Sequence, residues 1–319
     1  MLAVTALGKA KQARWSYGLA ALAVTAAWVA GCASVPAPGP QATLPPKSEA
    51  APPLVRKPSR LGLVLGGGAA KGFAHIGVIQ VLEEAGIHPD LVVGTSAGSL
   101  VAALYASGKS GQDLQKLALS MDEASFSDWR LPLFKPGVLR GEALARFVSV
   151  NLKSRQIQDL PMPLGVVATD LRSGLAVLFQ RGDTATAVRA SSAIPAVFQP
   201  VSIAGRDYVD GGLVSPVPVS HAKKMGADLV IAVDVSSEPD GKDAQDTFQV
   251  LMQTFAIMGK SISAFELLGA DVVVKPVMTG LTSASFSTRL EAIQFGRQAM
   301  MRQLPALRRL MDAKAKGHP

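Results

Sequence analysis

Cysteine is almost missing from this sequence: Cys32 is the only one among 319 residues. A single cysteine excludes a disulfide within the chain, although exported proteins usually carry cysteines in pairs. Aromatic residues amount to 5%, and no run of basic residues is interleaved with aromatic ones. The formal net charge of +8 therefore favours solubility, and the pattern does not indicate nucleic-acid binding.

Long hydrophobic runs are also scarce, and the first of them is short for a membrane span. The uncharged stretch from Tyr17 to Ala30 has 14 residues, whereas a spanning helix needs about 20. It follows a basic segment and ends in Val29-Ala30-Gly31-Cys32, which resembles the lipobox of bacterial lipoproteins. We therefore predict a lipoprotein signal peptide over residues 1–31 and lipid on the Cys32 thiol. An ordinary cleaved signal or an uncleaved anchor is the alternative.

Residues 32–59 are rich in proline and lack an apolar period. Eight prolines stand between Cys32 and Arg60, among alanine, serine and glycine residues. Such a segment cannot bury enough surface to fold, so we expect an extended tether that is anchored to the membrane by lipid. Ala33 stands where an aspartate would favour inner-membrane retention. We therefore expect an anchor in the bacterial cell envelope, at the outer membrane facing the periplasm.

From residue 60 to 312, short apolar runs alternate with longer helical patterns, and a basic tail follows at 313–319. This alternation predicts one α/β domain with a mostly parallel central sheet. Strands are predicted at 61–65, 89–94, 164–168, 175–180, 207–210, 229–234 and 271–275. Helices are predicted at 71–86, 97–107, 112–120, 141–152, 184–191, 216–225, 246–267 and 287–312. Gly86 and Gly108 fit the glycines that end helices.

A glycine-rich turn follows the first predicted strand, with the sequence GGGAAKG from Gly66 to Gly72. Backbone N–H groups in such a strand-to-helix turn can face a negative oxygen, helped by the helix dipole. That oxygen could belong to a phosphate or to a catalytic oxyanion. The phosphate loop of NTPases does not fit, because Lys71 is followed by glycine and phenylalanine, and a lysine also replaces the third glycine of a dinucleotide fingerprint.

The second turn of this kind is GTSAG, from Gly94 to Gly98, between a predicted strand and a predicted helix. In a nucleophile elbow the serine is held in a strained conformation at such a junction, and glycines two residues away leave room for the tight crossing. Ser96 is therefore a candidate nucleophile. The alternative is a tight turn with no chemistry.

A serine nucleophile needs a base, and the sequence offers several. Asp210 ends a predicted strand before Gly211 and Gly212, a pattern that is also ordinary turn chemistry. The order serine, aspartate, histidine could be met by Ser96, by Asp170 or Asp210, and by His221. However, neighbouring lysines suggest that His221 lies on the solvated face of a surface helix.

Three ordered motifs together resemble the patatin-like phospholipases, bacterial members especially. They are Gly66-x-Gly68-x-x-Lys71-Gly72, Gly94-x-Ser96-x-Gly98 and Asp210-Gly211-Gly212. The stretches HIGV (75–78), ASSAIPAVFQPV (190–201) and DGGLVSPVPV (210–219) also resemble that family. The resemblance covers roughly residues 60 to 300. It implies a three-layer α/β/α sandwich.

The resemblance also implies roles for individual residues. The family uses a Ser-Asp dyad without histidine, which makes Ser96 the nucleophile and Asp210 the base. It places the oxyanion hole on Gly66, Gly67, Gly68, Ala69, Lys71 and Gly72, with the donors expected around Gly67, Gly68 and Ala69. Gly94, Gly98, Gly211 and Gly212 support the motifs. Ser215 departs from the asparagine of close relatives, and no metal or cofactor is expected.

The resulting hypothesis is a membrane-anchored serine acyl hydrolase that cleaves acyl esters of phospholipids or related lipids through an acyl-enzyme on Ser96. One alternative is an envelope lipoprotein that uses the same fold as a binding or regulatory module without turnover. A thioesterase or protease-like serine hydrolase on the same scaffold is another. The segment DWRLPLFKPG (128–137) could form a lid or acyl channel, although buried core is the more usual role for such side chains.

Overall fold

The apolar runs of the sequence pair into a central β-sheet. The structure is a computed structural model that describes residues 59–121, 139–236, 246–278 and 287–316. Within these residues the sheet has eight strands in the order β5-β6-β3-β2-β1-β7-β8, with β4 also paired to β3. They are β1 (Leu61–Leu65), β2 (Leu91–Thr95), β3 (Leu164–Asp170), β4 (Ala176–Phe179), β5 (Val201–Ile203), β6 (Arg206–Asp210), β7 (Leu229–Val233) and β8 (Val272–Val274).

The centre of the sheet is parallel and one edge is antiparallel. Strands β3, β2, β1, β7 and β8 each run parallel to the next. The β3–β4, β3–β6 and β5–β6 pairs are antiparallel. The prediction of an α/β fold with a mostly parallel sheet is therefore confirmed.

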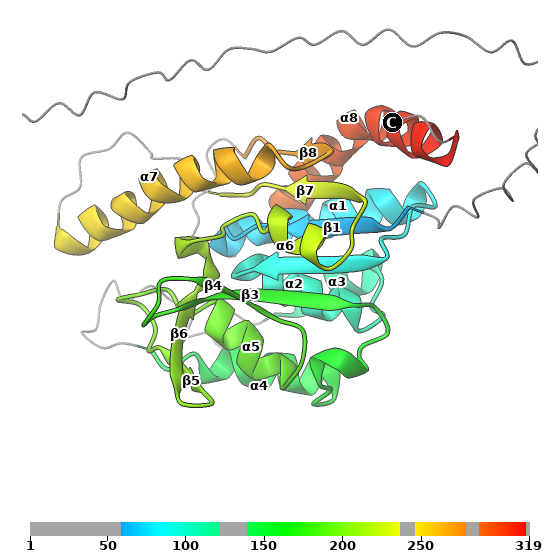
Figure 1. Cartoon of the computed structure of the whole chain (residues 1–319). Helices are drawn as coiled ribbons and strands as arrows, with labels where there is room; N and C mark the ends of the chain where they lie inside the picture. Colours follow the sequence, from blue (N-terminus) through cyan, green and yellow to red (C-terminus); the bar gives the residue numbers. More distant parts are fainter. Residues whose placement is uncertain (1–58, 122–138, 237–245, 279–286, 317–319) are drawn as a thin grey trace, which may run out of the picture. The chain divides into compact units, whose positions relative to one another are not determined.

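Eight α-helices accompany the strands within the described residues, and they cover both faces of the sheet (Figure 1). They are α1 (Ala74–Glu84), α2 (Ala97–Ala106), α3 (Gly111–Ser120), α4 (Glu142–Leu152), α5 (Thr184–Ser191), α6 (Val219–Lys224), α7 (Thr247–Leu267) and α8 (Arg289–Lys316). Short 3-10 helices lie at Ala69–Phe73, Ile157–Asp159 and Gly211–Leu213.

Each central strand contributes side chains to both faces, which explains its unbroken apolar run. Leu63 and Leu65 of β1 pack in a large cluster with residues of α1, α2, α3 and α8. Val64, between them, joins a second cluster with residues of α6. The two clusters confirm a sheet with helices on both sides, the three-layer arrangement that the family resemblance implies.

The helices and strands differ from the predicted ones in several places. The helix expected at 71–86 begins as the 3-10 helix Ala69–Phe73 and continues as α1. The strand β5, which has three residues, was not predicted; it joins β6 through a tight turn at Ala204 and Gly205, whose φ angles are 50° and 76°. Helix α8 runs to Lys316, past the expected end at 312, because its last residues are good helix formers and neither glycine nor proline occurs between Pro305 and Gly317.

Candidate active site

Ser96 stands at the sharp junction between β2 and α2. Its backbone has φ 53° and ψ −127°, a conformation that residues with a side chain rarely adopt. Its side chain is 7% exposed. A strained serine between a strand and a helix is the geometry of a nucleophile elbow.

Gly94 and Gly98 let the chain cross itself at this junction. A Cβ atom on Gly94 would overlap the carbonyl group of Gly98. A Cβ atom on Gly98 would overlap the carbonyl oxygen of Leu65, at the end of the neighbouring strand β1. These are backbone atoms that cannot move aside, so the glycines are required sterically for the turn that presents Ser96.

Asp210 lies against Ser96 although it ends a different strand. In the sheet register, Thr95 of β2 is opposite Val167 of β3, and Asp210 of β6 is opposite Ala168. The two strand ends therefore meet across β3. The Ser96 hydroxyl donates to Oδ2 of Asp210 at 2.6 Å.

The environment of Asp210 suits a base. The carboxyl group is 6% exposed, and burial raises its pKa from 3.8 to about 6, against the lowering effect of hydrogen bonds from Ser96 and Gly212. The Gly212 N–H donates to Oδ1 at 2.7 Å. Oδ2 is thereby left for the Ser96 proton, and a carboxylate with this pKa is a better proton acceptor than a solvated aspartate.

Helix α5 and the segment after it hold both residues in place. The Ser96 N–H donates to Oγ of Ser191 at 2.9 Å, and this hydroxyl donates onward to the Val167 carbonyl. The Asp210 N–H donates to the Ala193 carbonyl at 2.9 Å. Sequence reasoning did not assign these contacts, although both residues lie in the stretch at 190–201 that resembles the family.

The glycine-rich loop lies beside Ser96, but only some of its backbone N–H groups are available to donate to an oxyanion. The Gly66 N–H donates to Val233, and the Gly67 N–H donates to Pro216 at 2.9 Å. The expectation that Gly67 supplies an oxyanion donor is therefore wrong for this structure, because the fold already uses its N–H. Gly68 and Ala69 donate no backbone hydrogen bond to any residue that the structure describes.

Close packing fixes where this loop lies. A Cβ atom on Gly68 would overlap the carbonyl oxygen of Val235, and one on Gly72 would come within 2.8 Å of the Ala97 Cβ atom. Ala69 has a positive φ of 49°. The loop and the 3-10 helix that contains Lys71 therefore approach the start of α2, next to Ser96.

His75 stabilises the glycine-rich loop by a hydrogen bond and does not act as a base. It is fully buried in α1, and its Nε2 lies 2.8 Å from the Gly66 carbonyl oxygen. Burial lowers the pKa of His75 to about 4, so the ring is neutral at physiological pH. Because a carbonyl only accepts, Nε2 carries the proton and donates it.

The Ser-Asp-His alternative does not assemble. His221 is 6% exposed, so its predicted position on a solvated face is wrong; it turns inward while Lys223 and Lys224 face solvent. Its Nδ1 lies 3.4 Å from Oγ of Ser215. Asp170 accepts the Ser173 N–H and is paired with Arg206 at 2.9 Å, and these two contacts lower its pKa to about 2.

Glu266 of α7 is a further residue near the site that sequence reasoning missed. It accepts the Ser215 hydroxyl at 2.5 Å and the Val217 N–H at 2.9 Å. Burial raises the pKa of Glu266 to about 7. Ser215 therefore connects the Asp210 turn to α7.

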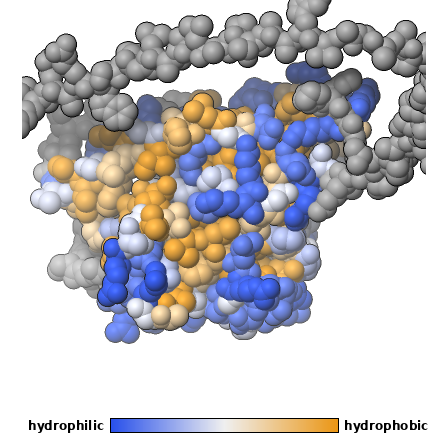
Figure 2. Space-filling view, viewed as in Figure 1, coloured by the Kyte–Doolittle hydropathy of each residue, from blue (hydrophilic) through white to orange (hydrophobic). Residues whose placement is uncertain are grey.

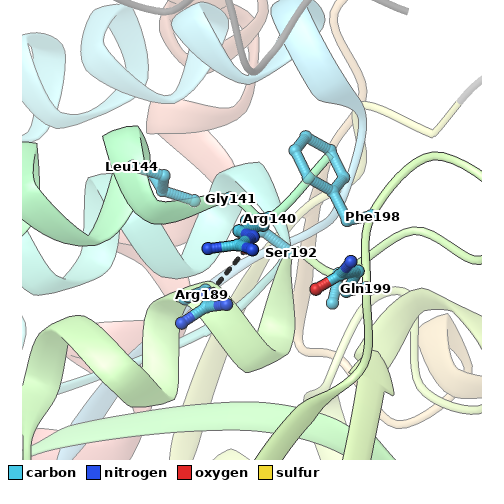
Figure 3. A pocket seen from close by; sticks show the side chains of 8 residues that line it. Arg140, Gly141, Leu144, Arg189, Ser192, Phe198 and Gln199 are labelled. Carbon is cyan, nitrogen blue, oxygen red and sulfur yellow. Dashed lines mark hydrogen bonds between the residues drawn. The ribbon is translucent and has the colours of Figure 1, made fainter. Parts of the chain in front are cut away.

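A narrow crevice lies beside the residues that hold Ser96 and Asp210 (Figure 3). Ser192 and Ala193 line it. The Ala193 carbonyl accepts the Asp210 N–H, and the hydroxyl of Ser191, the residue before them, accepts the Ser96 N–H. Arg140 and Arg189 lie at the same crevice, where the Arg189 Nε donates to the Arg140 carbonyl. The Ser192 hydroxyl has no hydrogen-bond partner among the described residues.

Neither a metal-binding cluster nor a membrane-spanning helix occurs among the described residues. No group of three or more histidine, cysteine, aspartate or glutamate side chains is placed there to hold a metal ion. No helix in that part of the chain is long and apolar enough to span a membrane. Cys32, the tether and the segment at 128–137 lie outside the described residues.

Comparison with known proteins finds relatives along the part of the chain that forms the site. Residues 63–223 match the model of the patatin-like phospholipase family. An uncharacterised NTE family protein of Mycobacterium tuberculosis is 38% identical over 193 residues, which cover 58% of this chain and 52% of the relative. The lysophospholipase nte1 of Aspergillus fumigatus is 36% identical over 184 residues, which cover 56% of this chain and 12% of that protein.

The match to the mycobacterial relative thus spans about half of that protein, and the match to the fungal one a smaller share. Among solved structures, VipD from Legionella pneumophila superimposes with a TM-score of 0.55 at 17% identity, over 78% of this chain and 67% of that one. At this identity the likeness concerns the fold.

Proposed function

Because the chain belongs to the patatin-like phospholipase family, we propose that it is a serine acyl hydrolase that cleaves acyl esters of phospholipids or lysophospholipids. The observation that carries the proposal is the 2.6 Å hydrogen bond from the strained Ser96 to the buried Asp210. The name of the fungal relative, a lysophospholipase, supports the choice of substrate class.

The proposed reaction begins with attack of Ser96 Oγ on the carbonyl carbon of the ester. Asp210 accepts the hydroxyl proton as the bond forms, and the carbonyl oxygen becomes an oxyanion. The N–H groups of Gly68 and Ala69 are the donors proposed to stabilise it; in other enzymes loss of one such donor slows the reaction about 100- to 1,000-fold. Collapse of the intermediate expels the alcohol, which takes the proton from Asp210.

The second half of the reaction returns the enzyme to its starting state. Water attacks the acyl group on Ser96 while Asp210 accepts one of its protons. The Ser96 oxygen leaves, regains that proton, and the fatty acid departs. No histidine is needed, because the carboxyl group that contacts Ser96 can both accept and return the proton.

Membrane attachment is a separate part of the proposal. We propose that lipid on Cys32 and the proline-rich tether hold the domain at the bacterial cell envelope, at the outer membrane facing the periplasm. The sequence Val29-Ala30-Gly31-Cys32 and the proline content of residues 32–59 support it. Intact-mass analysis of the chain from a bacterial membrane fraction, beside Cys32→Ser, tests it: a lipid adduct confined to the unsubstituted chain is expected.

Fatty acid release tests the enzymatic proposal. The full chain, Ser96→Ala and Asp210→Asn would each be incubated with vesicles of mixed phospholipids and, separately, with lysophospholipid. Release by the unsubstituted chain and its loss in both variants is the expected result. If the folded chain releases no more fatty acid than its variants, the hydrolase proposal fails and a binding module is favoured.

A further inference from the structure

Helix α7 presents an apolar face to solvent instead of burying it. Of its residues, only Ser263 is fully buried. In Figure 1 the helix extends to one side of the sheet, and in Figure 2 hydrophobic residues gather on that side. Five large apolar side chains at its surface are between 50% and 81% exposed: Val250, Ile257, Met258, Phe265 and Leu268.

These five residues, called here the apolar stripe, share one side of the helix. Val250 and Ile257 are seven residues apart, as are Met258 and Phe265, and Leu268 continues the row at the helix end. Seven residues complete two helical turns, so positions at this spacing lie one above the other. Thr254 and Ser261 lie on the same side, and their hydroxyls donate to the carbonyls of Val250 and Ile257 of the helix itself. An exposed apolar stripe of this length indicates an interaction surface.

The charges around the stripe favour an anionic lipid surface as the occupant. Asp246 and Glu266 are the carboxylates of residues 246–270, and both accept backbone N–H groups within the fold. The neighbouring helix α6 contacts α7 and carries Lys223 and Lys224, which are exposed. An apolar helix face with flanking lysines is the composition of helices that lie in the interface of anionic membranes.

Glu266 connects this helix to both sides of the candidate active site. Its carboxylate holds the Ser215 hydroxyl and the Val217 N–H. The Ser215 carbonyl in turn accepts the hydroxyl of Thr95, the residue before Ser96, at 2.8 Å. The carbonyl of Pro216, between Ser215 and Val217, accepts the Gly67 N–H of the glycine-rich loop at 2.9 Å.

We propose that the apolar stripe of α7 docks on anionic phospholipid surfaces and that Glu266 fixes the docked helix to the segment that supports Ser96 and the glycine-rich loop. This inference rests on the proposed lipid hydrolase function and adds the surface by which the domain meets aggregated substrate. It differs from the lipid anchor on Cys32, because it positions the active site rather than tethering the chain.

Docking is tested by a probe placed on the stripe of the full chain. In a Cys32→Ser, Ser96→Ala background, Phe265→Cys would be labelled with an environment-sensitive fluorophore. The matched control is Val150→Cys on α4, because Val150 and Phe265 are both 77% exposed. With phosphatidylcholine–phosphatidylglycerol vesicles we expect a blue shift and quenching by spin-labelled lipid at 265 but not at 150, and a weaker response with pure phosphatidylcholine.

Equal responses at the two positions, or none at either, overturn the proposal. A concentration-dependent shift at 265 without vesicles also overturns it, in favour of a second copy of the chain as the occupant. Because the Ser96→Ala background has no nucleophile, this experiment is independent of catalysis. Insertion at 265 in a protein whose unsubstituted form hydrolyses nothing would leave docking intact and refute the hydrolase proposal.

The consequence for activity is tested with a paired substitution. Phe265→Asp with Leu268→Asp is expected to lower hydrolysis of anionic vesicles at least about tenfold, since both charges oppose entry into the interface. Hydrolysis of a water-soluble short-chain ester should change less than about twofold, because neither residue belongs to the catalytic group. Val150→Asp is the control, and equal losses on both substrates would refute docking.

Discussion

Oδ2 of Asp210 lies 2.6 Å from the hydroxyl oxygen of Ser96, although 114 residues separate the two in the chain. The strand β3 brings them together, since it pairs with the strands that end in Thr95 and in Asp210. The same burial that places this carboxyl group against the serine also keeps its pKa near 6. The proposed proton transfer, the stability of the fold and its pH dependence are therefore linked at one residue.

The rate of ester hydrolysis should depend on the ionisation of Asp210. A base acts in its deprotonated form, so kcat/KM should fall tenfold for each pH unit below about 6 and level off above it. Initial rates on a water-soluble ester between pH 4.5 and 8.5 would measure this profile. A rate that stays constant down to pH 4.5 would contradict the assignment of Asp210 as the base.

Asp210→Asn should make the folded protein more stable at neutral pH. The native pKa is raised from 3.8 to about 6, so ionised Asp210 opposes folding above pH 6, and this cost disappears below pH 4. At about 1.4 kcal/mol per pH unit, the gain on substitution is up to about 3 kcal/mol. Urea unfolding at pH 7.5 and pH 4 would show a difference that shrinks at acid pH; a variant less stable at pH 7.5 would refute it.

Gly98→Ala should prevent the elbow from forming. The added Cβ atom would overlap the carbonyl group of Leu65, which cannot shift without disturbing β1. We expect a loss of at least about 3 kcal/mol in the free energy of unfolding, or no soluble protein. The matched control is Gly259→Ala in α7, where a Cβ atom meets nothing within 4 Å and alanine should stabilise the helix by up to about 1 kcal/mol.

His75→Phe should lower the rate by loosening the glycine-rich loop. The substitution removes the donor to the Gly66 carbonyl and leaves that oxygen buried without its partner, at a cost of about 1–3 kcal/mol in stability. We expect kcat to fall about tenfold with KM nearly unchanged, since the oxyanion donors act in the transition state. His88→Phe, at an exposed position, is the control; a change in KM alone would contradict the role assigned to His75.

The sequence pattern around Ser96 was enough to predict the nucleophile elbow, because its geometry depends on residues that are close together in the chain. A strand, a small-residue turn and a helix within a few residues identify Ser96 and its flanking glycines, because the crossing itself requires them. The Asp-Gly-Gly turn could be predicted equally well. However, Asp210 could be chosen over Asp170 as the base only through the family resemblance. The structure separates them, since Asp170 pairs with Arg206 and Asp210 contacts Ser96.

Contacts between distant segments could not be predicted from pattern. Ser191 meets the Ser96 N–H across 95 residues, and nothing in the sequence around either one specifies that partner. The family resemblance made Gly67 an oxyanion donor. The hydrogen bond from its N–H to the Pro216 carbonyl depends on the tertiary fold, so the sequence could not reveal it. His221 was predicted to lie on the surface because Lys223 and Lys224 follow it. In the helix α6, however, the two lysines face solvent and His221 faces the interior.

The measurement that tests the central claim most directly is the mass of the peptide that contains Ser96 after rapid acid quench of the chain with a long-chain ester. We expect an adduct equal to the acyl group on Ser96, formed by the unsubstituted chain within a turnover and absent from Ser96→Ala. In Asp210→Asn the adduct should form much more slowly. Fatty acid release without any adduct on this peptide, or an adduct on another residue, would contradict the account.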